Sequence, residues 1–349
     1  MIGGKCCKKI LLGLITVLAI CLSACRLSER KAEEKLKKLV EETKNDNFPV
    51  ISFEESEKLF EKEMKTPIEM KLGTYRVTEW DVREKGMRQP KGVLCRGEEI
   101  LLVDAEMHQI FRLDYEGNVL GTIGQMGSGP AEFQKPADIT EQNGKIYVLD
   151  AGNRRIQILN EKLEYEGELP VTSEMTSEPA EDGSIAVDAE ENVYLSRNLV
   201  LDADLLVYPK KSESPEVVEH HFYGCLSEKE GEVYAVNRGY FYFIPEKEET
   251  GVRGGKNGLW RLEGTQAEKV FDLPPFLYVS DFRIRGELIL YSSFYMSLMD
   301  FNSADGSYLQ TRLEKNDGKT YMHYLDEKDG CVYLTGARKG KICVVMPEE

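Results

Sequence analysis

Seven basic or aromatic residues in this sequence could hold a ligand, and each lies shortly after an apolar run. They are His108, Arg154, Arg197, Arg238, Tyr240, Tyr295 and Arg338, the last followed by Lys339. Arginine offers a rigid fork of N–H donors that matches a carboxylate, and tyrosine offers a flat ring for stacking. Because the whole chain has a net charge of -16, a group of such residues would focus a local positive field. The set predicts a site for an anionic ligand, such as an acidic glycan or a carboxylate-bearing peptide.

A second interpretation assigns these basic residues to the fold. Arg155, next to Arg154, closely follows Asp150, and Asp104 holds the corresponding place one unit earlier in the chain. A buried charge is normally paired with an opposite one. Arginines of this kind could therefore serve the repeat itself, and both interpretations stand at the level of the sequence.

The side chains that catalysis or metal binding needs are scarce. The chain has only four histidines, and two of them, His220 and His221, are adjacent, so on a strand they would point to opposite faces. No acidic loop has EF-hand spacing, and neither a Gly-x-Ser-x-Gly elbow nor a phosphate-binding loop occurs. We therefore expect no catalytic residue, no metal site and no cofactor. The alternative is a metal-assisted hydrolase or lyase, since carboxylates are abundant.

A recurring pattern decides which elements position these residues. A turn or acidic residue precedes an apolar strand six times, with equivalent places at Ile100, Ile146, Val193, Val233, Leu288 and Val332. The steps between these places are 46, 47, 40, 55 and 44 residues. A period of this size, with turn residues between short apolar segments, fits four strands per unit. The sequence predicts an all-β fold, a six-bladed β-propeller with four antiparallel strands per blade.

The propeller would bring the candidate ligand residues to one face. In such a ring, the turns between second and third strands lie on the same side as the links between blades. The seven residues fall on these turns, one group per blade, around the mouth of the central channel. Loops on a rigid scaffold often carry binding residues, so we expect a binding or interaction module. A scaffold subunit of an envelope complex is a further alternative, for which an exposed apolar patch on the rim would be the sign.

One stretch of the sequence resembles a known repeat. It comprises residues 123–139 (IGQMGSGPAEFQKPADI) and residues 146–158 (IYVLDAGNRRIQI). This stretch is similar to an NHL repeat of the six-bladed β-propeller type, and the similarity extends over residues 97–170. The resemblance implies that the glycines and the proline join two blades and that Phe133 fills the gap between their sheets.

The last copy of the pattern leaves room for only three strands of its blade. A ring removes exposed strand edges only by closing. Residues 74–82 alternate suitably for the missing outer strand. We expect this segment to complete the C-terminal blade of a propeller domain that spans residues 49–349.

The N-terminal residues resemble an export signal. Lysines precede an apolar run, and residues 22–25, Leu-Ser-Ala-Cys, look like the lipobox of bacterial lipoproteins. The resemblance implies a signal peptide of residues 1–24, cleavage before Cys25, a diacylglycerol thioether on its sulfur and a palmitate-type acyl chain on the new N-terminus. Residues 25–48 would form a charged, partly helical tether. We expect lipid anchoring in the cell membrane or outer membrane, facing the periplasm or the exterior, with an envelope protein as a candidate partner.

Four cysteines would remain in the body of the protein: Cys95, Cys225, Cys331 and Cys343. Disulfides persist outside the cytoplasm, and Cys331 and Cys343 flank one predicted hairpin, so they form a candidate disulfide. The alternative is that all four are small buried residues. No spacing resembles a zinc site. The negative net charge opposes contact with nucleic acid, so we expect no such partner.

Overall fold

Antiparallel strands make up most of the chain that the computed structural model describes. The described residues are 73–171, 183–197, 204–210, 212, 214–219, 222, 224–237, 240–244, 249–253, 258–272, 279–293, 297–313, 324–336 and 340–348. The chain divides into two compact units, Glu54–Tyr240 with Gly254–Glu349, and Met1–Phe53 with Phe241–Arg253. Within the described ranges, no helix is both long enough and apolar enough to cross a membrane.

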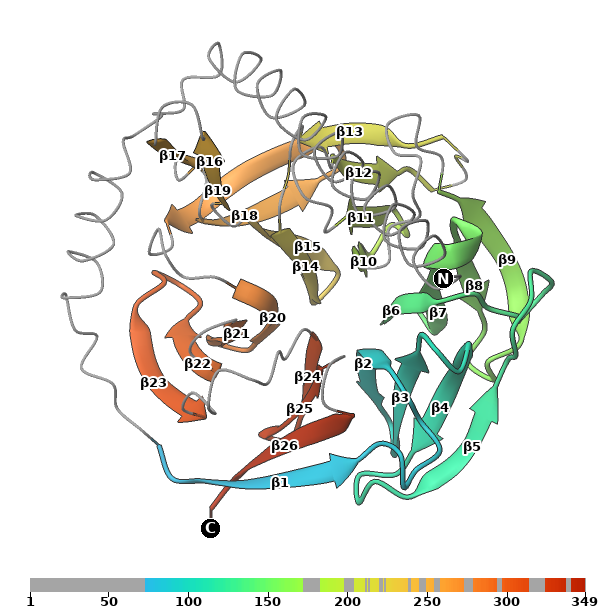
Figure 1. Ribbon diagram of the computed structural model, residues 1–349. Helices are drawn as coiled ribbons and strands as arrows, with labels where there is room; N and C mark the ends of the chain where they lie inside the picture. The colour runs from blue at the N-terminus through green and yellow to red at the C-terminus, as the bar shows by residue number, and fades with distance from the viewer. Residues whose placement is uncertain are drawn as a thin grey trace, which may run out of the picture. The chain divides into compact units, whose positions relative to one another are not determined.

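The larger unit consists of six four-stranded sheets, which we number as blades in chain order (Figure 1). Blade 1 contains β2 (Pro90–Arg96), β3 (Glu99–Asp104), β4 (Gln109–Leu113) and β5 (Val119–Ile123). Blade 2 contains β6 (Pro136–Gln142), β7 (Lys145–Asp150), β8 (Arg155–Leu159) and β9 (Tyr165–Pro170), with the 3-10 turn η1 (Ala151–Asn153) between β7 and β8. Blade 3 contains β10 (Gly183–Val187), β11 (Val193–Arg197), β12 (Leu205–Tyr208) and β13 (Glu216–Glu219).

The second half of the ring follows the same plan. Blade 4 contains β14 (Gly224–Lys229), β15 (Glu232–Asn237), β18 (Gly258–Glu263) and β19 (Gln266–Asp272). Blade 5 contains β20 (Val279–Arg285), β21 (Leu288–Ser293), β22 (Ser297–Asn302) and β23 (Tyr308–Leu313). Blade 6 contains β24 (Tyr324–Lys328), β25 (Cys331–Gly336), β26 (Lys341–Pro347) and β1 (Tyr75–Asp81). The predicted fold class, a six-bladed propeller with four antiparallel strands per blade, is confirmed.

The six apolar copies of the sequence pattern are the second strands of the blades. Each of these strands lies between two others of its own sheet, and each sheet packs between two neighbouring blades. A strand covered on both faces needs a nearly continuous apolar run. In β3, every residue from Ile100 to Asp104 is buried, and in β7 the same holds from Ile146 to Asp150. This burial explains why the second strand is the part of each repeat that the sequence preserves most clearly.

An inserted hairpin accounts for the longest step of the repeat. Between β15 and β18 the chain forms β16 (Tyr240–Ile244) and β17 (Glu249–Arg253), which pair only with each other. Strands β15 and β18 nevertheless pair directly, with Asn237 opposite Gly258. Blade 4 therefore keeps the four-stranded plan although 20 residues separate its second and third strands.

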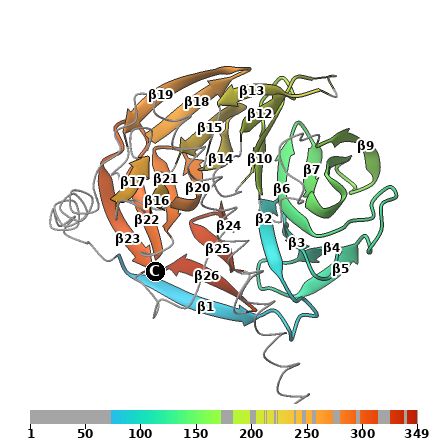
Figure 2. The ribbon, with the colours of Figure 1, turned by 45° about the horizontal axis from the view of Figure 1, so that its top comes forward.

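The ring closes between the two ends of the propeller sequence. Strand β1 pairs with β26, with Val77 opposite Val345 and Trp80 opposite Ile342, and both views show the two strands side by side (Figures 1 and 2). The first strand of each blade also contacts the first strand of the next, and β24 contacts β2. Residues 75–81 thus supply the outer strand that the three C-terminal strands lack.

Apolar packing concentrates at the joints between blades. The buried apolar side chains among the described residues form six clusters, one for each pair of neighbouring blades. Phe133 is completely buried at the joint between blades 1 and 2, together with Val103 and Ile146. This placement confirms the expected role of Phe133 in filling the gap between two sheets.

Candidate functional site

His108 and Arg154 occupy equivalent places in adjacent blades. Each is the last residue before the third strand of its blade, and each has a left-handed backbone, with φ of 57° and 55°. This conformation is uncommon for a residue with a side chain and turns the chain sharply into the next strand. Arg154 is exposed and His108 is half-buried. Both lie on turns between second and third strands.

Arg155, the neighbour of Arg154, is a structural residue. Its Nε donates to the buried carboxylate of Asp150 at 2.9 Å. Its two terminal nitrogens donate to the carbonyl oxygens of Ser128, Gly129 and Glu132, each at 2.9 Å. The side chain is therefore satisfied by the protein itself, as the interpretation that assigns arginines to the repeat expects.

A hydrogen bond connects the link between blades 1 and 2 to one of these turns. The backbone N–H of Lys135 donates to Nδ1 of His108 at 3.0 Å, so His108 helps to hold the link. Glu132 accepts from the N–H of Gly129 at 2.9 Å and from Gln125 at 2.8 Å. The bond from Gln125, followed by that from Gly129, lowers the pKa of the Glu132 carboxyl. The link is thus a rigid border of the candidate face.

The side chains of the other candidate ligand residues lie outside the described part of the chain. Arg197 ends β11 and Tyr240 begins β16, but the side chains of both lie outside the described part of the chain. Arg238, Tyr295, Arg338 and Lys339 lie outside the described residues altogether, as do Cys25, the signal segment 1–24 and the tether 25–48. Of the predicted set, the structure therefore places two side chains, those of His108 and Arg154.

The candidate disulfide between Cys331 and Cys343 is wrong. Both thiols are free. Cys343 lies opposite Leu334 in the register of β25 and β26, and Cys331 lies three residues further along β25. Three residues of a strand span about 10 Å, which is too far for two Cα atoms joined by a disulfide. Burial raises the pKa of the Cys343 thiol to about 12, in agreement with the alternative of small buried cysteines.

The first strands of the six blades surround the centre of the ring (Figure 1), and polar side chains connect some of them. The hydroxyl group of Tyr324, from β24, donates to the carbonyl oxygen of Gly183 in β10 at 3.4 Å. These strands belong to blades 6 and 3, which lie opposite each other. The guanidinium of Arg283, from β20, lies 3.1 Å from Asp281 and 3.5 Å from Asp326. The inner strands are therefore joined by polar contacts between blades.

Buried side-chain oxygens join the inner strands of neighbouring blades. Asp138 accepts from the N–H of Ile185 at 2.9 Å, and Asp281 accepts from that of Leu325 at 2.9 Å. Asp326 in turn accepts from the N–H of Cys95 at 2.7 Å. These bonds satisfy the inner-strand N–H groups that face the next blade. The sequence analysis did not identify these aspartates, although each stands in the first strand of its blade, shortly before an apolar second strand.

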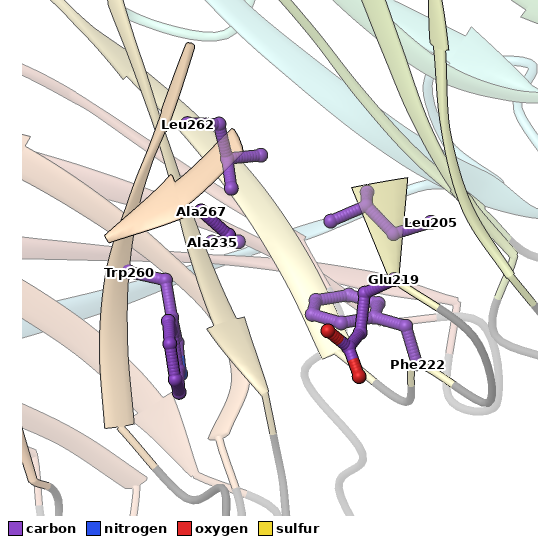
Figure 3. A pocket seen from close by; sticks show the side chains of 7 residues that line it. All are labelled: Leu205, Glu219, Phe222, Ala235, Trp260, Leu262 and Ala267. Atoms are coloured by element: carbon purple, nitrogen blue, oxygen red, sulfur yellow. The ribbon is translucent and has the colours of Figure 1, made fainter. Parts of the chain in front are cut away.

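A small apolar pocket opens between blades 3 and 4 (Figure 3). It holds about 20 Å³ and is lined by Leu205, Glu219, Phe222, Ala235, Trp260, Leu262 and Ala267. Trp260 lies on one side of the space, and Phe222 and Leu205 lie on the other. The volume suits about one water molecule or one methyl group, so we assign the pocket to imperfect packing between two sheets.

A wider groove of about 400 Å³ lies at the joint between blades 1 and 2 and includes Arg96, Glu99, Arg112, Leu120 and Glu141. Its charged groups pair with one another: Arg112 lies 2.7 Å from Glu99, and Arg96 lies 3.3 Å from Glu141. Glu98 also lines the groove, so its three glutamates outnumber its two arginines and leave it without surplus positive charge for an anion.

Two further features bear on the alternatives. Among the described residues, no three His, Cys, Asp or Glu side chains are grouped so that they could hold a metal ion. Exposed large apolar side chains on the outer strands are Val77, Val119, Leu120, Val217, Val270 and Leu309. They are spread over five blades, and scattered residues of this kind are normal on a soluble surface.

Comparisons with known proteins agree on the architecture. A family model described as "6-bladed beta-propeller" matches residues 42–192. No curated protein matches the chain significantly.

Among solved structures, the chain is similar to a streptogramin B lyase, with 12% identity, a TM-score of 0.51 and coverage of 78% of this chain and 98% of that one. It is also similar to a catalytically inactive virginiamycin B lyase from Staphylococcus aureus with quinupristin. This similarity has 8% identity, a TM-score of 0.51 and coverage of 78% of this chain and 99% of that one. The chain is also similar to a luciferin-regenerating enzyme, with 10% identity, a TM-score of 0.51 and coverage of 78% of this chain and 95% of that one. At such identities the similarity shows the fold alone.

Proposed function

We propose that this protein is a lipid-anchored, extracytoplasmic binding module whose ligand lies on the face that carries the turns between second and third strands. The observation behind this proposal is the pair of equivalent turn residues, exposed Arg154 and half-buried His108, in adjacent blades. The contacts that Tyr324 and Arg283 make between the inner strands of different blades favour a site on a face of the ring.

The ligand class follows from charge. Cations gathered on a chain with a net charge of -16 attract an anion locally while the rest of the surface repels it, which favours one docking position. We infer an acidic glycan or a carboxylate-bearing peptide, held by arginine forks from several blades. The NHL type of the repeat, inferred from residues 123–158, is part of this proposal.

The ligand face is tested by reversing one charge at a time. Arg154→Glu, Arg238→Glu and Arg338→Glu are compared with the unchanged protein on a panel of acidic glycans and carboxylate peptides. Each variant should lose at least tenfold in affinity, about 1.4 kcal/mol, and the loss should shrink at high salt. Lys162→Glu is the matched control, since this exposed lysine lies in the turn between the third and fourth strands of blade 2. If no panel member discriminates the arginine variants from the control, this ligand face is refuted.

The anchor is tested separately, so that its failure leaves the binding test unaffected. The unchanged chain should enter the detergent phase on phase separation and take up labelled palmitate. Cys25→Ala should do neither and should accumulate uncleaved. A Cys25→Ala protein that partitions and is labelled like the original would rule out lipidation at this residue.

A further inference from the structure

Three buried aspartates from three different blades gather near the axis of the ring around Arg283. Asp281 and Asp326 each have a guanidinium partner: Asp281 lies 3.1 Å from Arg283, and Asp326 lies 2.6 Å from Arg285. Asp138, from blade 2, interacts electrostatically with Asp281 and Arg283 of blade 5. Among the described residues, however, no cation lies within 4.0 Å of its carboxylate. The three buried aspartates face two guanidinium groups, and Arg285 is also shared with Glu327 at 3.4 Å. Among the described residues, no guanidinium is therefore left to pair with Asp138.

Among the described residues, the surroundings of Asp138 give it hydrogen bonds but no ion pair. Its oxygens accept from the backbone N–H groups of Ile139 and Ile185, each at 2.9 Å. Strand β10, which carries Ile185, has no ionisable side chain. Strand β2 presents Gly92, where an added Cβ atom would meet the Asp138 Cα at 2.6 Å. The largest charge interactions of Asp138 are with Asp281 and Arg283 of β20, and Arg283 is already shared with Asp281 and Asp326. Lys91, next to Gly92 on β2, is also buried, but no ion pair joins it to Asp138.

A buried carboxylate without a cationic partner is strongly disfavoured, and such a group normally takes up a proton instead of remaining charged. Asp138 is only 3% exposed, so solvent cannot stabilise its charge. We propose that Asp138 is a proton-binding site at the centre of the ring, where one proton supplies the missing positive charge of the aspartate–arginine cluster.

The proton belongs on Asp138 and not on its neighbours. Burial, and then the negative charge of Asp281, raise the pKa of Asp138 to about 7, although Arg283 opposes the shift. Burial also raises the pKa of Asp281, but Asp281 has the guanidinium of Arg283 and the N–H groups of Phe282 and Leu325 to stabilise its charge. Asp138 has only its two N–H groups.

Proton binding at Asp138 has a defined effect on stability. In the unfolded chain the carboxyl has its ordinary pKa, about 3.9, and in the folded ring its pKa is about 7. Between these values the folded state binds more protons than the unfolded state. The contribution of Asp138 is thus largest at the acidic end of this window and is lost as the pH rises from about 4 to about 7.

The proposal is tested on the full chain by infrared spectroscopy and by chemical unfolding. The unchanged protein should show the C=O band of a protonated carboxylic acid at pH 6 that disappears by pH 8.5, and Asp138→Asn should lack this band at both values. From about pH 4 to about pH 7 the unchanged protein should lose stability relative to Asp138→Asn, and above pH 7 the difference between the two should level off.

Asp300→Asn is the matched control, because Asp300 is equally buried but is paired with Arg312 at 2.9 Å. It should leave the acid band in place. If the unchanged protein has no acid band at pH 6, or if the band persists in Asp138→Asn, the proposal fails. The band of the unchanged protein can be read even if a variant does not fold.

Discussion

Two adjacent arginines show how differently single residues serve this ring. Arg155 is buried and connects Asp150 to three carbonyl groups of the link between blades, whereas Arg154 is exposed on the turn. The direction of each side chain follows from the left-handed conformation of Arg154, which ends the turn and starts the third strand at Arg155. Neighbours in sequence therefore face the surface and the core, respectively.

This difference predicts opposite outcomes for alanine substitution. Arg155→Ala should destabilise the protein by about 3 to 5 kcal/mol, because it leaves the Asp150 carboxylate buried without its partner. Arg154→Ala should change stability by no more than about 0.5 kcal/mol. Urea unfolding of both variants measures the two values. Equal losses in the two variants would contradict the assignment of Arg155 to the fold.

At the scale of elements, the outer strand of blade 6 is the part of the ring that comes from far away in the sequence. Strand β1 adds a fourth strand to the three C-terminal strands, with Glu79 opposite Cys343. Without it, β26 would present an unpaired edge. The pairing of β1 with β26 completes blade 6. The packing of blade 6 against blade 1 therefore depends on this pairing.

The register of this contact can be read with a disulfide. In Glu79→Cys, the new thiol should bond with Cys343 on oxidative refolding, because opposed residues of antiparallel strands have Cα atoms about 4.5 to 5.5 Å apart. The cross-link should stabilise the ring by about 2 to 4 kcal/mol, and peptide mapping would identify it. Thr78→Cys is the control, since its partner is Val344, and it should form no such bond. A cross-link in the control alone would mean that the register is shifted by one residue.

At the scale of the whole molecule, the ring is built from local sheets and a few long-range joints. The inserted hairpin β16–β17 adds chain without interrupting a blade, because β15 and β18 pair directly across its base. The segments of the chain thus differ in importance: β1 completes a sheet, and the insertion does not.

Two deletions should separate these roles. Replacing residues 238–257 with a two-residue Asn-Gly turn should leave a cooperatively unfolding propeller, because Asn237 and Gly258 are already opposite each other and such a turn suits a hairpin. Removing residues 73–81 should abolish cooperative unfolding. Thermal scans by circular dichroism distinguish the outcomes, and loss of the transition in the first variant would show that the ring needs the insertion.

The sequence by itself determined the number of blades, their four-stranded plan and the identity of the closing strand. Each blade is made of strands adjacent in the chain, so its signals are local: an apolar second strand, turn residues on either side, and a repeat step close to one blade. Phe133 was identified for the same reason, since it lies inside the link that it anchors. The insertion lengthened one step without obscuring the pattern.

Only the tertiary structure decided which side chains meet across the joints and the axis. Asp138 contacts Ile185, and Tyr324 reaches Gly183, through contacts between residues far apart in the chain. Cys331 and Cys343 flank a hairpin and were therefore a candidate disulfide, but the register separates them by three residues. Local patterns fix which residues form a strand, whereas register and closure fix which atoms are neighbours. The charge balance at Asp138 is therefore a property of the closed ring.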